Sequence, residues 1–247
     1  MPCADDLRLY AKYAENLRQA QAVSGKPGLL LGCTQLMSDW CKESGLRVTV
    51  MDFCEPLARS LQSRHQEWEG LRIIIDDWLS TSLAGASFCW AAGDGVVNAV
   101  GAGRETIRLF RQIHRLLLPG SIVILRNFFR SDPTPSAAEV LAKFAVGRIR
   151  SLNAFQHQLS SSLQPSFMEG VFTRETYKLM QEHHAIPAEQ LGAFDYYNTE
   201  NAALCYPTMA ELRELTHGDF EELEMSCGNY EMSELTPTIV YRSRVKD

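Results

Sequence analysis

Short apolar runs alternate with amphipathic stretches along the first half of the chain. The apolar runs cover residues 28–32, 47–51, 71–75, 86–92 and 121–125. Consecutive apolar residues are typical of strands buried on both faces, as in parallel sheets. Apolar residues recur at helical spacing over residues 5–23, 33–43, 56–66 and 104–117. These stretches are predicted helices, and the alternation predicts an α/β fold with helices on both faces of a parallel sheet.

Small or charged residues follow the predicted strands. The carboxyl ends of parallel strands meet at one edge of a sheet, because their crossover connections share one hand. In open α/β sheets, ligands bind in the crevice at that edge. The residues expected there are Gly32, Asp52, Asp77, Gly93, Asp94 and Arg126.

The second half of the chain has a different character. Residues 131–206 are rich in Phe and Tyr, and we interpret them as an insertion that covers the crevice. A capping-box pattern at Thr208 and Glu211 predicts one more helix. Two apolar segments, 220–227 and 238–245, with a tight return between them, predict an antiparallel pair. The expected organisation is a single domain over 1–247, with an N-terminal helical segment 1–26, a core 27–130, an aromatic lid 131–206 and a C-terminal helix and strand pair 207–247.

Composition narrows the range of partners. The chain has 247 residues, with 24 Lys and Arg against 30 Asp and Glu, and a formal net charge of −6. A net-acidic chain without a long basic run is a poor nucleic-acid binder, because that affinity comes from clustered Lys and Arg. No apolar stretch is long enough to span a membrane, and the N-terminus lacks the apolar core of a secretory signal. The seven cysteines form no Cys-x-x-Cys pair. We expect a cytoplasmic protein with a small-molecule substrate, no metal and no membrane partner; the oligomeric state stays open.

Two loops carry the clearest candidate chemistry. Gly32, between a predicted strand and a helix, lets a ligand approach the backbone and the free N–H groups of the helix. The dinucleotide pattern Gly-x-Gly-x-x-Gly is absent, as is a P-loop. Asp52 ends the next strand, where a carboxylate can accept hydrogen bonds from both hydroxyls of a ribose, or can cap the following helix. Asp94, between two glycines, fits either the ammonium of a small zwitterion or a turn.

Several motifs occur together in one order. They are Leu29–Thr34, Val48–Asp52, Asp77-Trp78, Gly93-Asp94-Gly95, and His114–Gly120 followed by Ile122–Arg126. In this order they resemble class I S-adenosylmethionine (SAM)-dependent methyltransferases, over roughly residues 27–130. The resemblance implies a Rossmann-like, doubly wound, seven-stranded sheet that is mostly parallel, with an antiparallel final strand and here a helical lid insertion. The first loop reads Gly32-Cys33-Thr34, where the commonest pattern of the family is Gly-x-Gly-x-Gly.

The resemblance also implies a cofactor and its contacts. SAM is the implied cofactor, as methyl donor or as substrate. Gly32, Cys33 and Thr34 would border its methionine part, and Asp52, followed by Phe53, would meet the ribose. Asp77 and Trp78 would lie near the adenine. Gly93, Asp94 and Gly95 would line the sulfonium side.

Catalytic groups are harder to recognise, because methyl transfer is an in-line displacement in which the enzyme chiefly aligns the reactants and excludes water. A general base is needed where the acceptor must lose a proton. The candidates are Asn98, Asn153, His157 and Tyr177, with His183 and His184 as further possible bases. A structural role is the alternative for each.

Three functions fit these residues. The first is methyl transfer from SAM to a small organic acceptor. The second resembles the azetidine-2-carboxylate synthases, in which the α-amine of SAM attacks its own γ-carbon and methylthioadenosine leaves. The third is a non-catalytic subunit that senses SAM.

Overall fold

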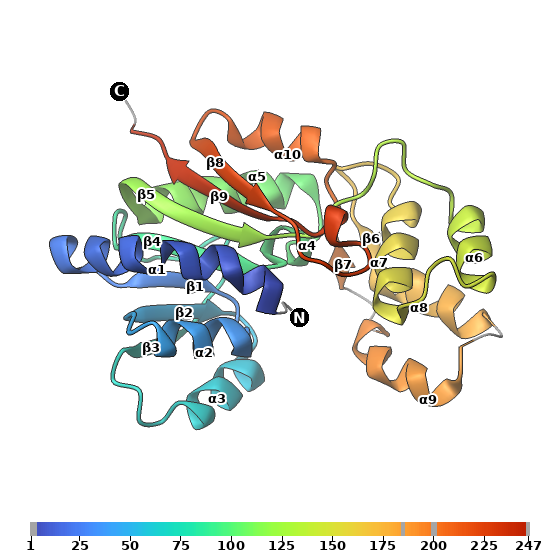
Figure 1. The fold of residues 1–247 in the computed structure, drawn as a ribbon, viewed down its shortest axis with the longest axis horizontal. Coiled ribbons are helices and arrows are strands. Elements are labelled where there is room, and N and C mark those ends of the chain that lie inside the picture. Colours follow the sequence, from blue (N-terminus) through green and yellow to red (C-terminus); the bar gives the residue numbers. More distant parts are fainter. Residues whose placement is uncertain (1–3, 184–185, 199–201, 246–247) are drawn as a thin grey trace.

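A single seven-stranded sheet forms the centre of the computed structural model, which describes residues 4–183, 186–198 and 202–245. The strands, in chain order, are β1 (Gly28–Leu31), β2 (Val48–Asp52), β3 (Leu71–Ile75), β4 (Phe88–Asp94), β5 (Leu117–Arg126), β8 (Phe220–Ser226) and β9 (Thr238–Ser243). Their order across the sheet is β3-β2-β1-β4-β5-β9-β8 (Figure 1). β9 runs antiparallel to both of its neighbours, while the other pairs are parallel. This confirms the predicted sheet with a reversed final strand.

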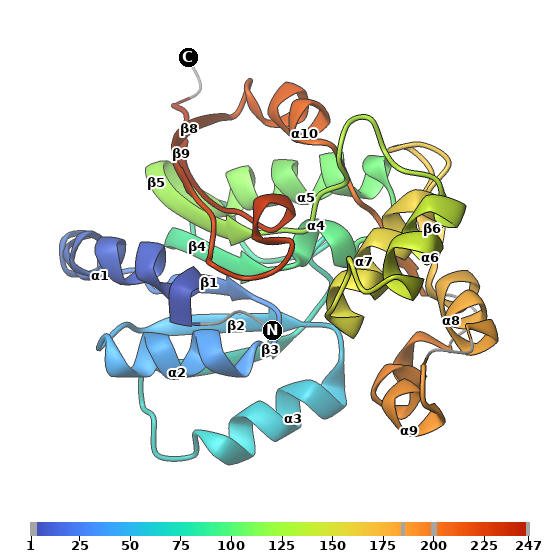
Figure 2. The same cartoon turned by 45° about the vertical axis from the view of Figure 1, so that its right-hand side comes forward.

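Helices cover both faces of the sheet (Figures 1 and 2). One face carries α1 (Ala4–Ser24), α2 (Gln35–Glu43) and α3 (Glu55–Arg64). The other carries α4 (Val96–Ala99), α5 (Gly103–Leu116) and α10 (Met209–Thr216). The chain between β3 and β4 crosses without a helix.

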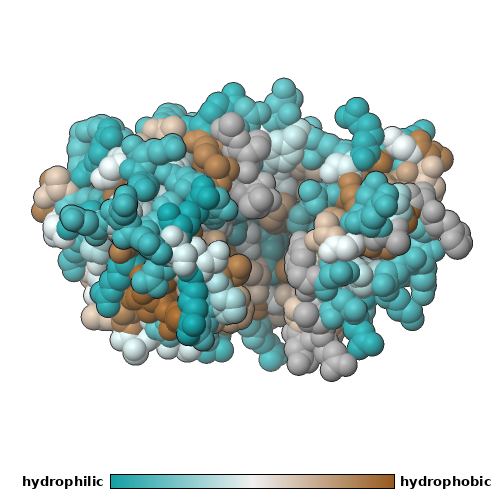
Figure 3. Space-filling model, turned by 90° about the horizontal axis from the view of Figure 1, so that it is seen from below, coloured by the Kyte–Doolittle hydropathy of each residue, from teal (hydrophilic) through white to brown (hydrophobic). Residues whose placement is uncertain are grey.

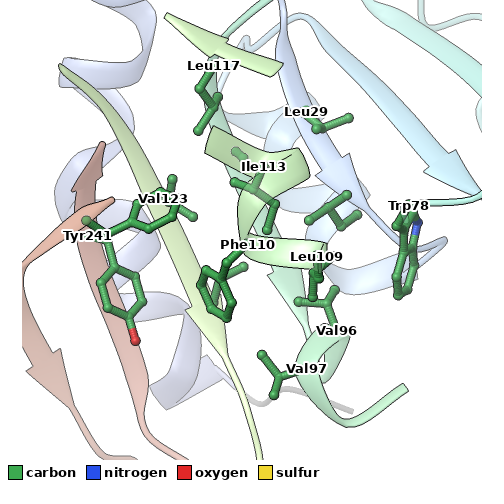
Figure 4. Packing of buried hydrophobic residues seen from close by; sticks show 14 of the residues in the cluster. Leu29, Trp78, Val96, Val97, Leu109, Phe110, Ile113, Leu117, Val123 and Tyr241 are labelled. Carbon is green, nitrogen blue, oxygen red and sulfur yellow. The ribbon is translucent and has the colours of Figure 1, made fainter. Parts of the chain in front are cut away.

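The two faces have separate apolar cores, because successive residues of a strand point to opposite sides. Leu29 and Leu31 of β1 lie in the core under α5, whereas Leu30 lies in the core under α1 and α2. All three leucines are fully buried, as the continuous apolar run predicts. Figure 4 shows Phe110 and Ile113 of α5 packed over the strands. Burying each such side chain contributes about 1.5–3 kcal/mol.

The segment 131–206 forms a lid with its own core, on the right in Figure 1. It contains α6 (Ala137–Ala145), α7 (Leu152–Leu163), β6 (Val171–Phe172), α8 (Thr173–Glu182), α9 (Ala188–Leu191), the 3₁₀ helix η1 (Gly192–Tyr197) and β7 (Ala203–Leu204). The rings of Phe144 and Phe155 stack with centroids 4.0 Å apart, which joins α6 to α7. The lid is therefore a packed helical unit and not an extended loop.

The C-terminal segment differs from the sequence-based expectation in one respect. The return from β8 to β9 is not tight: residues 227–237 form a loop that contains the 3₁₀ helix η2 (Ser233–Leu235). β9 also inserts between β5 and β8, so it is an inner strand. The loop hydrogen-bonds to both α1 and the lid, through Tyr230 and Glu231. Within the described residues, no helix combines the length and apolarity needed to cross a membrane.

Candidate functional site

A cavity of about 660 Å³ lies between the carboxyl edge of the sheet and the lid. Its wall combines the start of α2, one side of α3, the ends of β4 and β5, the first turns of α7, and the 227–237 loop. Six of the residues expected at the site line it: Cys33, Thr34, Asp94, Arg126, Asn153 and His157. The edge predicted to bind a ligand is thus the floor of this cavity.

The first corner of the site is a carboxylate held by two loops, Asp52, which lies behind Cys33 and is not itself part of the cavity lining. Gly32 has φ +90°, a left-handed conformation that favours glycine. The next residue, Cys33, donates its N–H to Oδ2 of Asp52 at 2.8 Å, and Cys54 donates to Oδ1 at 2.9 Å. Asp52 is 6% exposed. The Cys33 thiol also hydrogen-bonds to this carboxylate, which still has acceptor capacity because each oxygen has two acceptor positions.

Two side chains beside this carboxylate have contrasting environments. Burial, together with the charge of Asp52, raises the pKa of the Cys33 thiol to about 12, so the thiol stays protonated at neutral pH. Phe53, directly after β2, is 67% exposed. Phe53 is not part of the cavity lining.

The second corner is a buried ion cluster at the ends of β4 and β5. The guanidinium of Arg126 donates to both oxygens of Asp94, from Nε at 2.7 Å and from Nη2 at 3.2 Å. Its Nη1 donates to Asp6 of α1 at 3.2 Å. Tyr230 of the 227–237 loop donates to the other Asp6 oxygen at 2.8 Å. The Arg126 side chain is 3% exposed, so this cluster ties α1, the sheet and the 227–237 loop together at the cavity floor.

The third corner is an aromatic stack that joins the sheet to the lid. Phe128 lies below the guanidinium of Arg126, with 5.2 Å between the guanidinium carbon and the ring centroid. The imidazole of His157 of α7 stacks on the Phe128 ring, with 4.0 Å between the ring centroids and 15° between the ring planes. Its Nδ1 lies 3.3 Å from the hydroxyl of Tyr206. Burial lowers the pKa of His157 to about 3, and the positive charge of Arg126 acts in the same direction; the imidazole is therefore neutral at physiological pH.

Solved structures with the same architecture identify the fold. A SAM-dependent methyltransferase from Methanosarcina mazei aligns over 89% of this chain and 93% of its own, with a TM-score of 0.57 and 17% identity. The N-methyltransferase NodS from Bradyrhizobium japonicum, in complex with S-adenosyl-L-homocysteine, aligns over 97% and 89%, with a TM-score of 0.52 and 12% identity. The chain has the class I SAM-dependent methyltransferase fold.

A third similar structure is described as an enzyme of another class. A protein from Rhodobacter sphaeroides described as a Zn-dependent alcohol dehydrogenase aligns over 99% of this chain and 92% of its own, with a TM-score of 0.67 and 14% identity. In the described part of the present chain, no three His, Cys, Asp or Glu side chains gather as a metal site would require. No family model matches the sequence, and no curated protein matches it either.

Within this methyltransferase fold, some predicted residues lie behind the cavity wall. Trp78 is 8% exposed, and its Nε1 donates to the carbonyl of Met51 at 2.7 Å. Its ring lies 3.5 Å from the position that a Cβ on Gly32 would take, so the indole supports the Gly32 loop from below. Asp77 is exposed and accepts hydrogen bonds from the Leu79 N–H and the Ser80 hydroxyl, both at 2.9 Å.

The two glycines around Asp94 have different requirements. A Cβ on Gly93 would lie 2.7 Å from Val96 and 3.3 Å from Leu31, so packing demands glycine there. Gly95 has φ +67°, and its backbone conformation demands glycine. Neither residue lines the cavity directly.

Three predicted catalytic residues serve the scaffold in the structure. The Asn98 amide donates to the carbonyls of Phe128 and Cys205, both at 2.7 Å, and accepts from the Phe128 N–H at 2.9 Å. Tyr177 belongs to the lid core and donates to Asp195 at 2.6 Å. His183 packs edge-on against Phe144. Asn153 is exposed on the cavity wall, and His184 lies outside the described residues.

Several cavity residues were not singled out from the sequence. Arg64 comes from α3, Gln156 from α7, and Tyr230, Glu231 and Met232 from the 227–237 loop. No local pattern marks them, because each reaches the cavity through the packing of elements distant in sequence. The positive φ of Met232, +71°, shows how sharply that loop turns at the cavity.

Proposed function

We propose that the protein binds SAM at the carboxyl edge of β1, β2 and β4 and transfers its methyl group to a small organic acceptor in the cavity under the lid. The observation that carries the proposal is the Asp52 carboxylate. It stands at the end of β2 beside the Gly32 loop, held by two backbone N–H groups, and its oxygens have acceptor capacity beyond those two bonds.

The residues of the chain fit the parts of this cofactor. A carboxylate fixed at this strand end can accept hydrogen bonds from the hydroxyls of a ribose, one of them in place of the Cys33 thiol. The exposed ring of Phe53 offers a flat apolar surface for a base. Asp94 reaches the cavity, and the net-acidic neighbourhood of Asp6 and Asp94 suits an ammonium group. When bound, the sulfonium supplies an electrophilic methyl group.

The side chains of the cavity align and shield reactants; none is poised as a strong base. His157 cannot hold a proton taken from an acceptor at neutral pH, because a group with a pKa of about 3 releases it at once. We assign it a neutral hydrogen-bonding role on the lid side of the cavity. The Arg126 cluster holds the lid-facing loop and α1 in place. Catalysis then rests on alignment and on exclusion of water.

The size of the cavity favours an external acceptor over cyclisation of SAM. An opening of about 660 Å³ lies within the range of sites that take drug-sized ligands. It extends from Cys33 across to Asn153 and Tyr230, on opposite walls. Methyl transfer needs room for an acceptor beside the cofactor, whereas cyclisation of SAM needs room for SAM alone.

Binding is tested with Asp52→Asn and a matched control, Glu43→Gln, which changes an exposed carboxylate of α2 in the same way. We expect Asp52→Asn to raise the dissociation constant of S-adenosylhomocysteine by about 10- to 100-fold in calorimetry, because charge-assisted hydrogen bonds contribute about 1.5–3 kcal/mol. Glu43→Gln should leave it unchanged. Equal binding by both variants would remove the support of the proposal.

The reaction is tested by incubation with SAM alone and with a panel of small amines, phenols and carboxylic acids. Methyl transfer should give S-adenosylhomocysteine only when an acceptor is present, as measured by mass spectrometry. Methylthioadenosine formed from SAM alone would identify the cyclase instead. Binding without either product would identify the sensor.

A further inference from the structure

The two edges of the sheet are protected very differently. β8, at one edge, carries Glu221, Glu222 and Glu224, and its register with β9 shifts between the last two. Acidic side chains and a bulge are the usual devices that stop an edge strand from pairing with another chain. β3, at the other edge, reads Leu-Arg-Ile-Ile-Ile, and Ile75 is 53% exposed. The β3 edge lacks both devices.

The backbone of β3 has free hydrogen-bonding groups on its outer side. The Gly70 carbonyl accepts from Val48 of β2, and the Asp76 N–H donates to Asp52 of β2. Backbone groups alternate in direction along a strand, so the N–H and C=O groups of Arg72 and Ile74 also point to β2. The N–H and C=O groups of Ile73 and Ile75 therefore point away from the sheet. β2 is the one strand bonded to β3 in the described chain.

The side chains along β3 are complementary to those of a second copy running the other way. Arg72 is exposed and has no ion pair within the described residues. Asp76 follows β3 four positions further on, and its carboxylate accepts from the Thr81 hydroxyl and the Asp77 N–H, with acceptor capacity left for a cation. A two-fold axis at Ile74 sets Arg72 opposite Asp76 of the second copy, and the reverse. On the other face the same register sets Ile73 opposite Ile75. Opposite charges and apolar pairs placed in this way stabilise antiparallel strands.

Registers shifted along the strand lose this match. A two-fold axis at Ile73 sets Glu69 opposite Asp77, two like charges, and leaves Arg72 facing Ile74. An axis at Arg72 sets the two arginines opposite each other. Because the outward backbone groups belong to odd-numbered residues, the second copy must also set its odd-numbered residues opposite them. All three axes meet this requirement, but of the three the axis at Ile74 alone also pairs opposite charges.

We propose that two copies of this chain associate through antiparallel pairing of their β3 strands, with the two-fold axis at Ile74, to form one continuous sheet. Figure 3 shows the molecule from below the view of Figure 1, and its left half has an apolar area among hydrophilic side chains. The interface is isologous, because the same strand serves both copies. Its short length predicts a dimer that dissociates on dilution.

The test measures the oligomeric state of the full chain by sedimentation velocity over a range of concentrations. Ile73→Pro removes an outward N–H and no bond to β2, so the fold should persist while the pairing is lost. Arg72→Asp turns two attractions into repulsions and should raise the dimer dissociation constant at least about tenfold. Arg108→Asp, the same charge change at an exposed position of α5, is the matched control. Circular dichroism verifies that each variant is folded.

A concentration-dependent dimer that is weakened by Ile73→Pro and Arg72→Asp, but not by Arg108→Asp, supports the proposal. A monomer at all concentrations overturns it and leaves the β3 edge to a strand of another protein. A dimer that survives both β3 variants overturns it as well, because it uses another surface. Neither result depends on SAM binding, which is measured separately.

Discussion

At the scale of single residues, the site is defined by how each ionisable group is partnered. Asp52 has two backbone donors and Asp94 has a bidentate guanidinium, so both carboxylates are held in fixed positions. His157 instead lies between an aromatic ring and a phenol, and this environment disfavours its charged form. Two fixed carboxylates at the ends of β2 and β4 thus face a neutral ring on the lid side.

The low pKa of His157 predicts a pH dependence of stability. The unfolded chain protonates this residue below about pH 6.5, whereas the folded chain does so only near pH 3. The unfolded state thus binds more protons in this window, and the free energy of unfolding should fall as the pH drops from 6.5 towards 3. Denaturant unfolding of His157→Gln should show a shallower fall than the wild type over the same range.

The same residue gives a kinetic expectation. If His157 stays neutral during turnover, the pH dependence of the reaction rate between pH 5 and 8 should have the same shape in the wild type and in His157→Gln. A step in that range that the substitution abolishes would show that His157 titrates during turnover and would contradict the neutral role. His217, exposed at the end of α10, provides the control substitution His217→Gln.

At the scale of elements, the join between α7 and the 227–237 loop fixes the position of the lid. The Glu231 carboxylate accepts hydrogen bonds from the N–H groups of Arg150 at 2.8 Å and Ser151 at 2.7 Å. Ser151 in turn caps the helix by accepting from the Ala154 N–H. A negative charge at the start of a helix is also favoured by the helix dipole.

Removal of this carboxylate should loosen the lid. Glu231→Ala leaves two backbone N–H groups without their acceptor, and we expect it to lower the free energy of unfolding by about 0.5–2 kcal/mol, as the loss of a helix cap does. Glu234→Ala, an exposed residue of the same loop, is the matched control. Urea denaturation of the two variants measures the difference. Equal stabilities would show that solvent replaces the Glu231 contacts without loss.

At the scale of the whole molecule, the proposed cofactor site joins segments that are far apart in the chain. A ligand that binds the folded state alone raises its stability by mass action. S-adenosylhomocysteine at 100 times its dissociation constant should contribute about 2.7 kcal/mol. For a chain of this size that raises the Tm by roughly 5–10 °C.

The measurement is a thermal melt of the wild type and of Asp52→Asn at the same ligand concentration. The shift should be smaller in the variant, because it lacks the carboxylate proposed to bind the ribose. A full shift in Asp52→Asn would place the ligand away from β2.

The sequence by itself determined the strands, most of the helices and the edge at which they end. These features depend on which neighbouring residues are buried, and the local pattern of apolar residues indicates this directly. The apolar run Leu29 to Leu31, for example, predicts a strand buried on both faces, and β1 is such a strand. The order of the motifs also predicted the seven-stranded methyltransferase fold with its reversed strand.

Only the tertiary structure decided which side chains meet at the cavity. Asp6 and Arg126 are 120 positions apart, and Arg150 and Glu231 are 81 apart. No local pattern encodes such pairs, because their contact arises from the packing of whole elements. The same reason explains Asn98 and Tyr177, whose residue types fit catalysis but whose partners are backbone carbonyls and Asp195. A side chain takes its role from its neighbours, and folding selects those neighbours.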